Sequence, residues 1–379
     1  MALKGASMTD LKQRSLAVDV MRGLTLMLMI IVNMALDEQR SYGQLLHSIW
    51  HGFTLTDAVF PAFLFSVGVS LALSMDRQRL AGETAFRAQV LRRTALLFAI
   101  GFVLSWLPFF AYDPTLGVLQ FIDLGHTRIL GVLQRIALTY GLAAVLTQRF
   151  GTRGAWVALC GSLLIYPFIL GATGDLSLEG SGERALDLFL FGAAHLYTGE
   201  GIPFDPEGLL STLPALANVL GGYLAGRWLQ REGVTARALA VLAGMALAAL
   251  AVALLWSEAL PLNKKLWTSS YALLNLGIDG LVLALLAYLI DLRGVRIGTN
   301  LCANFGRNTL ALYVCSEVGN LMLSRTWIGD TSTFEWVHTH LYAPWAGLKF
   351  GSLLYSLTYL LLCGLLAREL ARRDVHIRL

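Results

Sequence analysis

Charged residues are scarce in this chain. Asp, Glu, Lys and Arg make up 14% of its 379 residues and hydrophobic residues make up 56%, whereas a soluble domain averages about 25% charged residues. The mean hydropathy is +0.62. This composition excludes an ordinary soluble protein and predicts an integral membrane protein. The net charge of +4 is small, and we expect no nucleic-acid partner.

Cysteine is also scarce, and long polar segments are missing. The four cysteines are scattered within or beside apolar segments, at Cys160, Cys302, Cys315 and Cys363. Their spacing fits neither a disulfide framework nor a metal site, so we expect no bound metal. The longest polar stretch, 171–208, is too short to bury a core of its own. The sequence also has no repeat of fixed period and no phosphate-binding glycine loop.

What the chain has instead is a series of apolar segments of membrane-spanning length. Spanning takes about 20 mostly apolar residues, and ten stretches fit this template. They are 17–36, 57–75, 92–110, 129–147, 155–171, 209–226, 237–256, 268–290, 305–324 and 345–367. We therefore predict one all-α domain over residues 1–379, a polytopic membrane helix bundle of about ten transmembrane helices.

The basic residues predict how this bundle is oriented. Most arginines fall on one set of connections, including the 76–93 loop and the 227–237 link. By the positive-inside rule we expect both termini in the cytoplasm, with a polar N-terminus at 1–16 and a basic tail at 368–379. The first helix is predicted to stay as an anchor instead of being removed as a signal peptide. The long 171–208 loop is then external.

A polar hairpin between the first two apolar segments is the strongest candidate for chemistry. It runs from His47 to Gly52, and polar groups at membrane depth usually mark a functional site. A histidine has an ordinary pKa of about 6.5, so His47 can take a proton from an attacking amine or hydroxyl, or attack a thioester itself. The alternative is an interfacial histidine without a catalytic role. His51, beside Trp50, also fits a place in the aromatic belt.

Two further polar residues flank this hairpin, and each has a structural alternative. Asp57 stands at the start of a helix, where a carboxylate caps backbone N–H groups, but it can equally orient a histidine ring. Asn33 lies near the outer end of the first apolar run. It can hydrogen-bond a neighbouring helix or donate to a developing oxyanion.

Polar residues later in the chain extend the set of candidates. Arg128, Gln134 and Arg135 lie in or beside an apolar segment, where an unpaired arginine is costly, so a counter-ion or an anionic ligand is expected. The acids of Asp205-Pro206-Glu207-Gly208 suit the positive end of a helix dipole. Asn263 and Lys264 combine interface anchoring with contact to a substrate or phosphate. Asn308 and Ser316 form one more polar stripe.

Taken together, these stretches resemble the heparan-α-glucosaminide N-acetyltransferase family and its bacterial homologues. The resemblance covers nearly the whole chain in order. The stretches that carry it are Arg14 to Gly23, Val32-Asn33, His47-Ser48-Ile49-Trp50-His51-Gly52, Thr56-Asp57-Ala58-Val59-Phe60-Pro61, Gly131-Val132-Leu133-Gln134-Arg135, Asp205-Pro206-Glu207-Gly208-Leu209-Leu210, Asn263-Lys264-Lys265-Leu266-Trp267 and Gly306-Arg307-Asn308. The residues after Asn33 depart from the glycine-containing Asn-x-x-Gly stretch that is typical of the family.

The resemblance implies an enzyme of the bacterial cytoplasmic (inner) membrane, in the core form without the N-terminal lumenal region of lysosomal members. It implies transfer of acetyl from cytosolic acetyl-CoA to the amine of a glucosamine-type sugar or glycan at the outer face. The family's active-site histidine matches His47, and its accompanying asparagine and aspartate match Asn33 and Asp57. A homodimer and membrane lipid are the other expected partners.

The remaining candidates are assigned by the part of the reaction that they suit. We expect the acetyl-CoA contacts to come from Arg128, Gln134, Arg135, Asn308 and Ser316. We expect the acceptor contacts to come from Trp50, His51, Asn263 and Lys264. Two other functions stay open: an O-acyltransferase of a cell-surface glycan, which differs only in its hydroxyl acceptor, and a secondary transporter.

Overall fold

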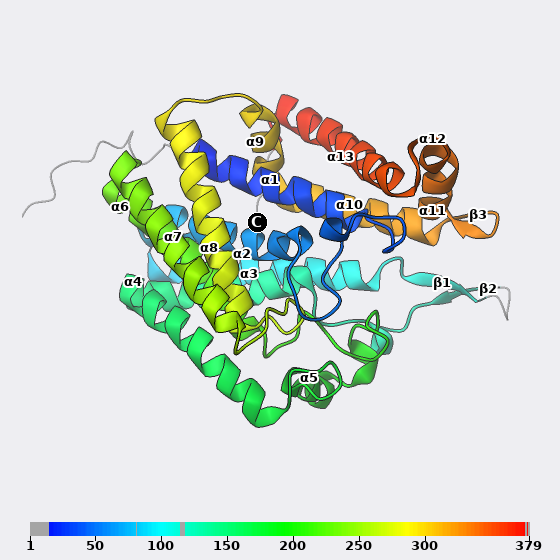
Figure 1. Ribbon diagram of the computed structural model, residues 1–379, viewed down its shortest axis with the longest axis horizontal. Helices are drawn as coiled ribbons and strands as arrows, with labels where there is room; N and C mark the ends of the chain where they lie inside the picture. Colours follow the sequence, from blue (N-terminus) through cyan, green and yellow to red (C-terminus); the bar gives the residue numbers. More distant parts are fainter. Residues whose placement is uncertain (1–14, 81, 114–117, 376, 378–379) are drawn as a thin grey trace, which may run out of the picture.

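The computed structural model describes residues 15–80, 82–113, 118–375 and 377. Residues 1–14 of the predicted polar N-terminus and positions 376, 378 and 379 of the predicted tail lie outside the described residues. Within the described chain, most residues are helical (Figure 1). The long helices are α1 (Leu16–Asn33), α2 (Leu55–Leu80), α3 (Glu83–Trp106), α4 (Val132–Thr173), α6 (Thr212–Glu232), α7 (Ala236–Ser257), α8 (Ser269–Leu286), α10 (Thr309–Arg325) and α13 (Leu348–Arg372).

Shorter elements connect these helices. The short helices are α5 (Gly182–Phe191), α9 (Thr299–Arg307), α11 (Thr333–Val337) and α12 (Ala343–Ala346). Two π-helical segments, Ala287–Leu292 and His338–Tyr342, extend α8 and α11. Single 3-10 turns lie at Gly43–Leu45, Leu124–His126 and Ala193–His195.

Seven helices of the described chain are long and apolar enough to cross a membrane. They are α1, α2, α3, α4, α7, α8 with its π-helical extension, and α13. α4 contains two helical stretches that meet at a kink at Gly151, where the backbone is not helical (φ 62°, ψ −153°). These two stretches correspond to the predicted segments 129–147 and 155–171. The predicted segment 305–324 is divided at Asn308 between α9 and α10. A count of about ten spans and the cytoplasmic orientation of the termini remain predictions.

α6 lies at the centre of the bundle and packs against α2 and α4. Glycine makes the closest of these contacts possible. A Cβ added at Gly68 would lie 1.8 Å from the carbonyl oxygen of Val219, and one at Gly222 would lie 2.0 Å from that of Phe65. Small residues let helix backbones approach in this way in membrane bundles. α2, which begins beside the His47 hairpin, is thereby fixed to the core.

α1 is held on its other side by α9, α10 and α13 (Figure 1). Here too glycine allows backbones to meet. A Cβ at Gly23 would lie 1.8 Å from the carbonyl oxygen of Cys302, and one at Gly306 would lie 1.9 Å from that of Asp19. These contacts fix the N-terminal half of α1 against α9.

Two short antiparallel hairpins depart from the all-α prediction. β1 (Phe110–Asp113) pairs with β2 (Val118–Phe121), and β3 (Trp327–Ile328) pairs with β4 (Thr331–Ser332). Figure 1 shows both hairpins extending from the same end of the molecule. The predicted segment 92–110 ends early, because α3 stops at Trp106 and the chain then turns toward β1. Aromatic pairs such as Phe110 with Phe121 stabilise that hairpin.

Candidate active site

The loop that carries His47 connects α1 to α2 and is fixed by contacts with distant segments. The indole Nε1 of Trp50 donates to the carbonyl oxygen of Leu176 at 2.8 Å. The backbone N–H of Gly52 donates to the carbonyl oxygen of Leu262 at 2.9 Å. Gly52 has a φ of 128°, which favours glycine because other residues rarely adopt it. The hairpin is therefore held on two sides and turns sharply after His51.

Asp57 hydrogen-bonds His47 and caps α2 at the same time. Its Oδ1 lies 2.7 Å from Nδ1 of His47. Its Oδ2 accepts from the backbone N–H of Thr54 at 2.9 Å, from the Thr54 hydroxyl at 3.0 Å and from the backbone N–H of Ser48 at 3.3 Å. This is the capping-box arrangement, in which an acid in the first turn reaches back to the cap residue. Oδ1 thus serves the predicted role of orienting the histidine ring, and Oδ2 serves the predicted role of capping the helix.

This contact orients the His47 ring. The Asp57 side chain is completely buried, while the His47 side chain is 45% exposed. A carboxylate at Nδ1 favours the tautomer with the proton on that nitrogen, which leaves Nε2 as a proton acceptor. The hydroxyl of Tyr271, on α8, donates to the backbone oxygen of Asp57 at 2.5 Å and ties the first turn of α2 to α8.

The surroundings keep this imidazole neutral. Burial lowers the pKa of His47, the Lys264 ammonium lowers it further, and Asp57 and Glu207 act in the opposite direction. The net shift is downward from the ordinary value of about 6.5. His47 is therefore mostly uncharged near neutral pH, which is the form that can act as a base.

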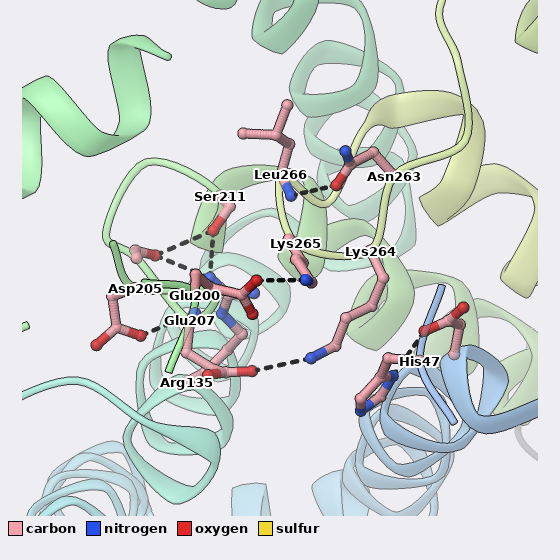
Figure 2. A network of polar contacts seen from close by, with 12 residues as sticks. His47, Arg135, Glu200, Asp205, Glu207, Ser211, Asn263, Lys264, Lys265 and Leu266 are labelled. Atoms are coloured by element: carbon pink, nitrogen blue, oxygen red, sulfur yellow. Dashed lines mark hydrogen bonds and ion pairs between the residues drawn. The ribbon is translucent and has the colours of Figure 1, made fainter. Parts of the chain in front are cut away.

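Lys264 connects His47 to a network of buried ion pairs. Figure 2 shows the Lys264 side chain extending toward Glu207 with the His47 ring beside its ammonium group. The Lys264 Nζ lies 3.5 Å from Oε1 of Glu207, and Arg128 donates to Oε2 of Glu207 at 2.5 Å. Arg128 also donates to both oxygens of Asp205, at 2.6 and 2.8 Å. The two cations and two anions balance one another.

The Asp205–Glu207 stretch therefore has a different role from the one its sequence indicates. Its acids do not cap α6, which begins only at Thr212; they pair with Arg128 and Lys264. Burial disfavours the charged form of Glu207, but the charges of Lys264 and Arg128 outweigh this effect and hold its pKa below the usual range. Glu207 is consequently ionised, and the ion pairs with Arg128 and Lys264 hold it in place.

Asn263 and Arg135 shape the wall around this network. Asn263 accepts from the backbone N–H of Leu266 at 2.8 Å, closing the turn that presents Lys264, and its amide lies 3.3 Å from Nδ1 of His51. Arg135 is 1% exposed. It donates to the Gly208 carbonyl at 2.9 Å and to the Ser211 hydroxyl, and it stacks over the ring of Trp267.

Two acids on α5 were not identified by the sequence. Glu183 and Asp187 are completely buried, whereas Phe189 on the same helix is 86% exposed. Burial raises the pKa of Asp187 to about 6 and that of Glu183 well above its usual range. A helix with its acids inside and its aromatic side chain outside fits a position at the membrane interface. The pattern of acids at i and i+4 was the available signal.

The structure brings together some of the predicted site residues. His47, Asp57, Lys264 and Arg128 belong to one connected set, and Trp50, His51, Asn263 and Arg135 line its surroundings. Lys265, which lies in the same predicted stretch as Asn263 and Lys264, joins them by donating to the Ile49 carbonyl at 2.7 Å and pairing with Glu200.

Other predicted residues make contacts elsewhere. Asn308 donates to the carbonyl of Val375 and accepts from the N–H of Ile377, each at 3.0 Å. The Ser316 hydroxyl donates to the backbone carbonyl oxygen of Tyr313, and the Gln134 amide donates to that of Ile129. None of these described contacts joins the His47 set, so the assignment of these three residues to acetyl-CoA remains a prediction.

Asn33 contacts α10 instead of His47 within the described contacts. Its amide Nδ2 donates to Oε1 of Glu317 at 2.7 Å.

Among the residues that the structure describes, no three His, Cys, Asp or Glu side chains are arranged to hold a metal ion. The absence of a bound metal remains a prediction.

Comparisons with known proteins place the chain in a family. The family model described as "Heparan-alpha-glucosaminide N-acetyltransferase, catalytic" matches residues 14–260. The mouse heparan-alpha-glucosaminide N-acetyltransferase is 27% identical over 361 residues, covering 79% of this chain and 53% of the relative. The human enzyme of the same name is 26% identical over 368 residues, covering 82% of this chain and 54% of the relative.

The matched region contains most of the site described above. It includes His47, Asp57, Arg128 and Glu207, while Lys264 follows just beyond it. The chain spans about half the length of the curated relatives that it matches. Because the family model covers well over half of the sequence, this chain belongs to the heparan-alpha-glucosaminide N-acetyltransferase family.

Proposed function

We propose that this protein is a membrane-bound acetyltransferase that moves acetyl from acetyl-CoA to the amine of a glucosamine-type sugar. The observation that carries the proposal is the 2.7 Å contact between His47 and Asp57. It leaves Nε2 of a neutral, partly exposed imidazole available in a chain of this family.

The chemistry requires a base at this point. An amine is protonated at neutral pH and cannot attack a thioester until it loses a proton. His47 takes that proton, the amine nitrogen forms a bond to the acetyl carbon, and the carbon–sulfur bond breaks. The leaving thiolate takes a proton from the imidazolium, and the new amide nitrogen releases its second proton to water, so that one proton is liberated per turnover. In the alternative route, His47 attacks the thioester and carries the acetyl group before the amine accepts it. Both routes need a neutral His47.

The other assigned residues have supporting roles in this proposal. Asn33 donates to the acetyl carbonyl oxygen; its amide nitrogen carries two hydrogens, and Glu317 engages one of them. Trp50, His51, Asn263 and Lys264 contact the acceptor. The residues that we propose to contact acetyl-CoA are Arg128, Gln134, Arg135, Asn308 and Ser316.

The cellular setting is part of the same proposal. Acetyl-CoA arrives from the cytoplasm and the acceptor from the outer face, across a bacterial inner membrane. Both termini are cytoplasmic, and the enzyme acts as a homodimer. The seven apolar helices and the distribution of arginines support the membrane setting.

Purified protein with radiolabelled acetyl-CoA tests the proposal. The assay contains glucosamine, a sugar with hydroxyl groups only, or no acceptor, and is repeated with His47→Ala. We expect label on the glucosamine nitrogen, reduced about 100-fold or more in the variant. Label on the hydroxyl-only sugar would indicate an O-acyltransferase. Absence of acetyl-CoA turnover, with sugar uptake by proteoliposomes, would indicate a transporter and refute the proposal.

The no-acceptor reaction separates the two routes. Protein-bound label that is lost in His47→Ala, and that passes to glucosamine when it is added, would support an acetyl-histidine. Turnover that appears only when both substrates are present, without labelled protein, would support direct transfer. Wild-type turnover in His47→Ala would exclude both roles for this residue.

A further inference from the structure

The end of α1 is tied to α10 by two hydrogen bonds that converge on Asn33. The Asn33 amide donates to the Glu317 carboxylate at 2.7 Å. From the next turn of α10, the Asn320 amide donates to the backbone oxygen of Asn33 at 3.1 Å. Side chain and backbone of one asparagine are thereby held by one helix. The carboxylate of Glu317 has a fixed position relative to the end of α1.

Glu317 differs from Asp205 and Glu207 because no ion pair balances it within the described residues. Asp205 and Glu207 pair with Arg128 and Lys264. Among the residues that the structure describes, no lysine, arginine or histidine forms an ion pair with Glu317, and its hydrogen bond is to a neutral amide. A carboxylate without a counter-charge in an apolar helix is unfavourable, and such residues usually mark a ligand pathway.

Glu317 lies on the side of α10 that contacts the end of α1 at Asn33. Tyr313 is one helical turn earlier on α10, so its side chain shares a face with that of Glu317. The charges of Glu317, Glu207 and Arg128 all act on the Tyr313 hydroxyl. Tyr313 is buried, and its hydroxyl is influenced both by Glu317 and by the ion pair of Glu207 with Arg128. Asn33 is exposed and Glu317 only partly buried, so a ligand can reach them.

We propose that Glu317, held by Asn33, is the binding group for the positively charged amine of the acceptor. The inference rests on the proposed function and specifies how the acceptor is chosen. An unbalanced carboxylate attracts an ammonium group strongly where the local dielectric is low. It offers nothing comparable to a neutral hydroxyl, and it repels the phosphates of acetyl-CoA. Glu317 therefore selects amino sugars over neutral sugars.

Glu317 and His47 have separate tasks in this arrangement. Glu317 binds the amine in its protonated, charged form, and His47 accepts the proton that must leave before acetyl transfer. Removing the charge of Glu317 should weaken acceptor binding while leaving the chemical step in place. Asn33 also fixes the carboxylate, so its replacement should weaken glucosamine binding less than Glu317→Gln does, in addition to the loss of kcat expected from its proposed role at the acetyl carbonyl oxygen.

Equilibrium binding of radiolabelled glucosamine, with glucose as the neutral analogue, tests the proposal directly. The full-length protein, Glu317→Gln, Glu317→Asp and the control Glu335→Gln are compared; Glu335 pairs with Arg40, away from the network. We expect Glu317→Gln to weaken glucosamine binding by about 10-fold or more, with Glu317→Asp recovering part of it. Glucose should bind weakly to all four proteins, and the control should match the wild type.

Kinetics on the same proteins separate this inference from the proposed function. Glu317→Gln should raise KM for glucosamine about 10-fold, with kcat and KM for acetyl-CoA changed less than about 3-fold. Wild-type glucosamine binding by Glu317→Gln, or equal binding of glucose and glucosamine by the wild type, would overturn the inference. Glucosamine binding that depends on Glu317 without any acetyl-CoA turnover would support this site and refute the acetyltransferase reaction.

Discussion

The ammonium group of Lys264 lies 3.5 Å from Glu207 and beside the imidazole of His47. One lysine thus belongs both to a buried ion-pair network and to the environment of the candidate base. The relationship has a consequence for catalysis, because the charge that balances Glu207 also disfavours protonation of His47. Proton uptake at the site is therefore set by residues from three distant parts of the chain.

Replacing Lys264 by methionine should move the acid limb of the pH–rate profile to higher pH. The lysine charge lowers the pKa of His47, and Glu207 raises it; without the lysine, the pKa of His47 rises and more of the base is protonated at low pH. The loss of kcat/KM should therefore be larger at about pH 6 than at about pH 8. A profile measured across this range checks the direction of the shift.

Lys265→Met is the matched control for this experiment. Lys265 is the next residue and holds the hairpin through Ile49 and Glu200, but its charge is not among those that act on His47. Its replacement should lower activity similarly at all pH values. An unshifted acid limb in Lys264→Met, or an equal shift in both variants, would contradict the assigned role.

Asp57→Asn should impair both catalysis and the start of α2. Asp57 accepts hydrogen bonds with both oxygens, and an asparagine has only one acceptor oxygen. We expect kcat to fall about 100-fold and stability to fall by about 1 kcal/mol. Turnover and thermal unfolding measured on the same preparation check the two effects. Asp37→Asn, in the same connection, should leave kcat within about two-fold; a comparable loss there would indicate a general loop defect.

The helices could largely be predicted because long apolar runs are an unambiguous signal. The details that failed have local causes. The predicted break at 148–154 is present as a kink at Gly151, where the backbone is not helical, but no loop separates the two helical stretches. The β1–β2 hairpin has too few residues to show a strand pattern. The predicted segment 209–226 is found as α6, which begins at Thr212 and continues to Glu232.

The contacts within the site could be predicted only between residues that are close in sequence. His47 and Asp57 are ten residues apart in one hairpin, so their contact follows from local geometry. The Lys264–Glu207 pair spans 57 residues, and the Asn33–Glu317 pair spans 284. No spacing rule connects residues so far apart, since only helix packing brings them together. Glu317 accordingly had no signal beyond being an acid in an apolar segment.

Arg128→Met should lower the stability of the folded protein, because two buried acids lose the same cation. The variant leaves Asp205 without its bidentate partner and leaves Glu207 with Lys264 alone. Breaking a buried ion pair by removing one partner costs about 3–5 kcal/mol, because the remaining charge is uncompensated. We expect a clear fall in Tm in detergent. Adding Asp205→Asn should recover part of it; an unchanged Tm in the single variant would show that these charges remain solvated.

Gly306→Ala should separate α1 from α9. The added methyl group would lie 1.9 Å from the backbone oxygen of Asp19, and no flexible side chain can move out of its way. Overpacking of this kind costs about 1–3 kcal/mol or more, so we expect a lower Tm and less monodisperse protein on size exclusion. Gly161→Ala is the control, since a Cβ there has nothing within 4 Å. It should be neutral or stabilise α4 by up to about 1 kcal/mol. Equal Tm values for the two variants would show that close backbone packing does not hold these helices together.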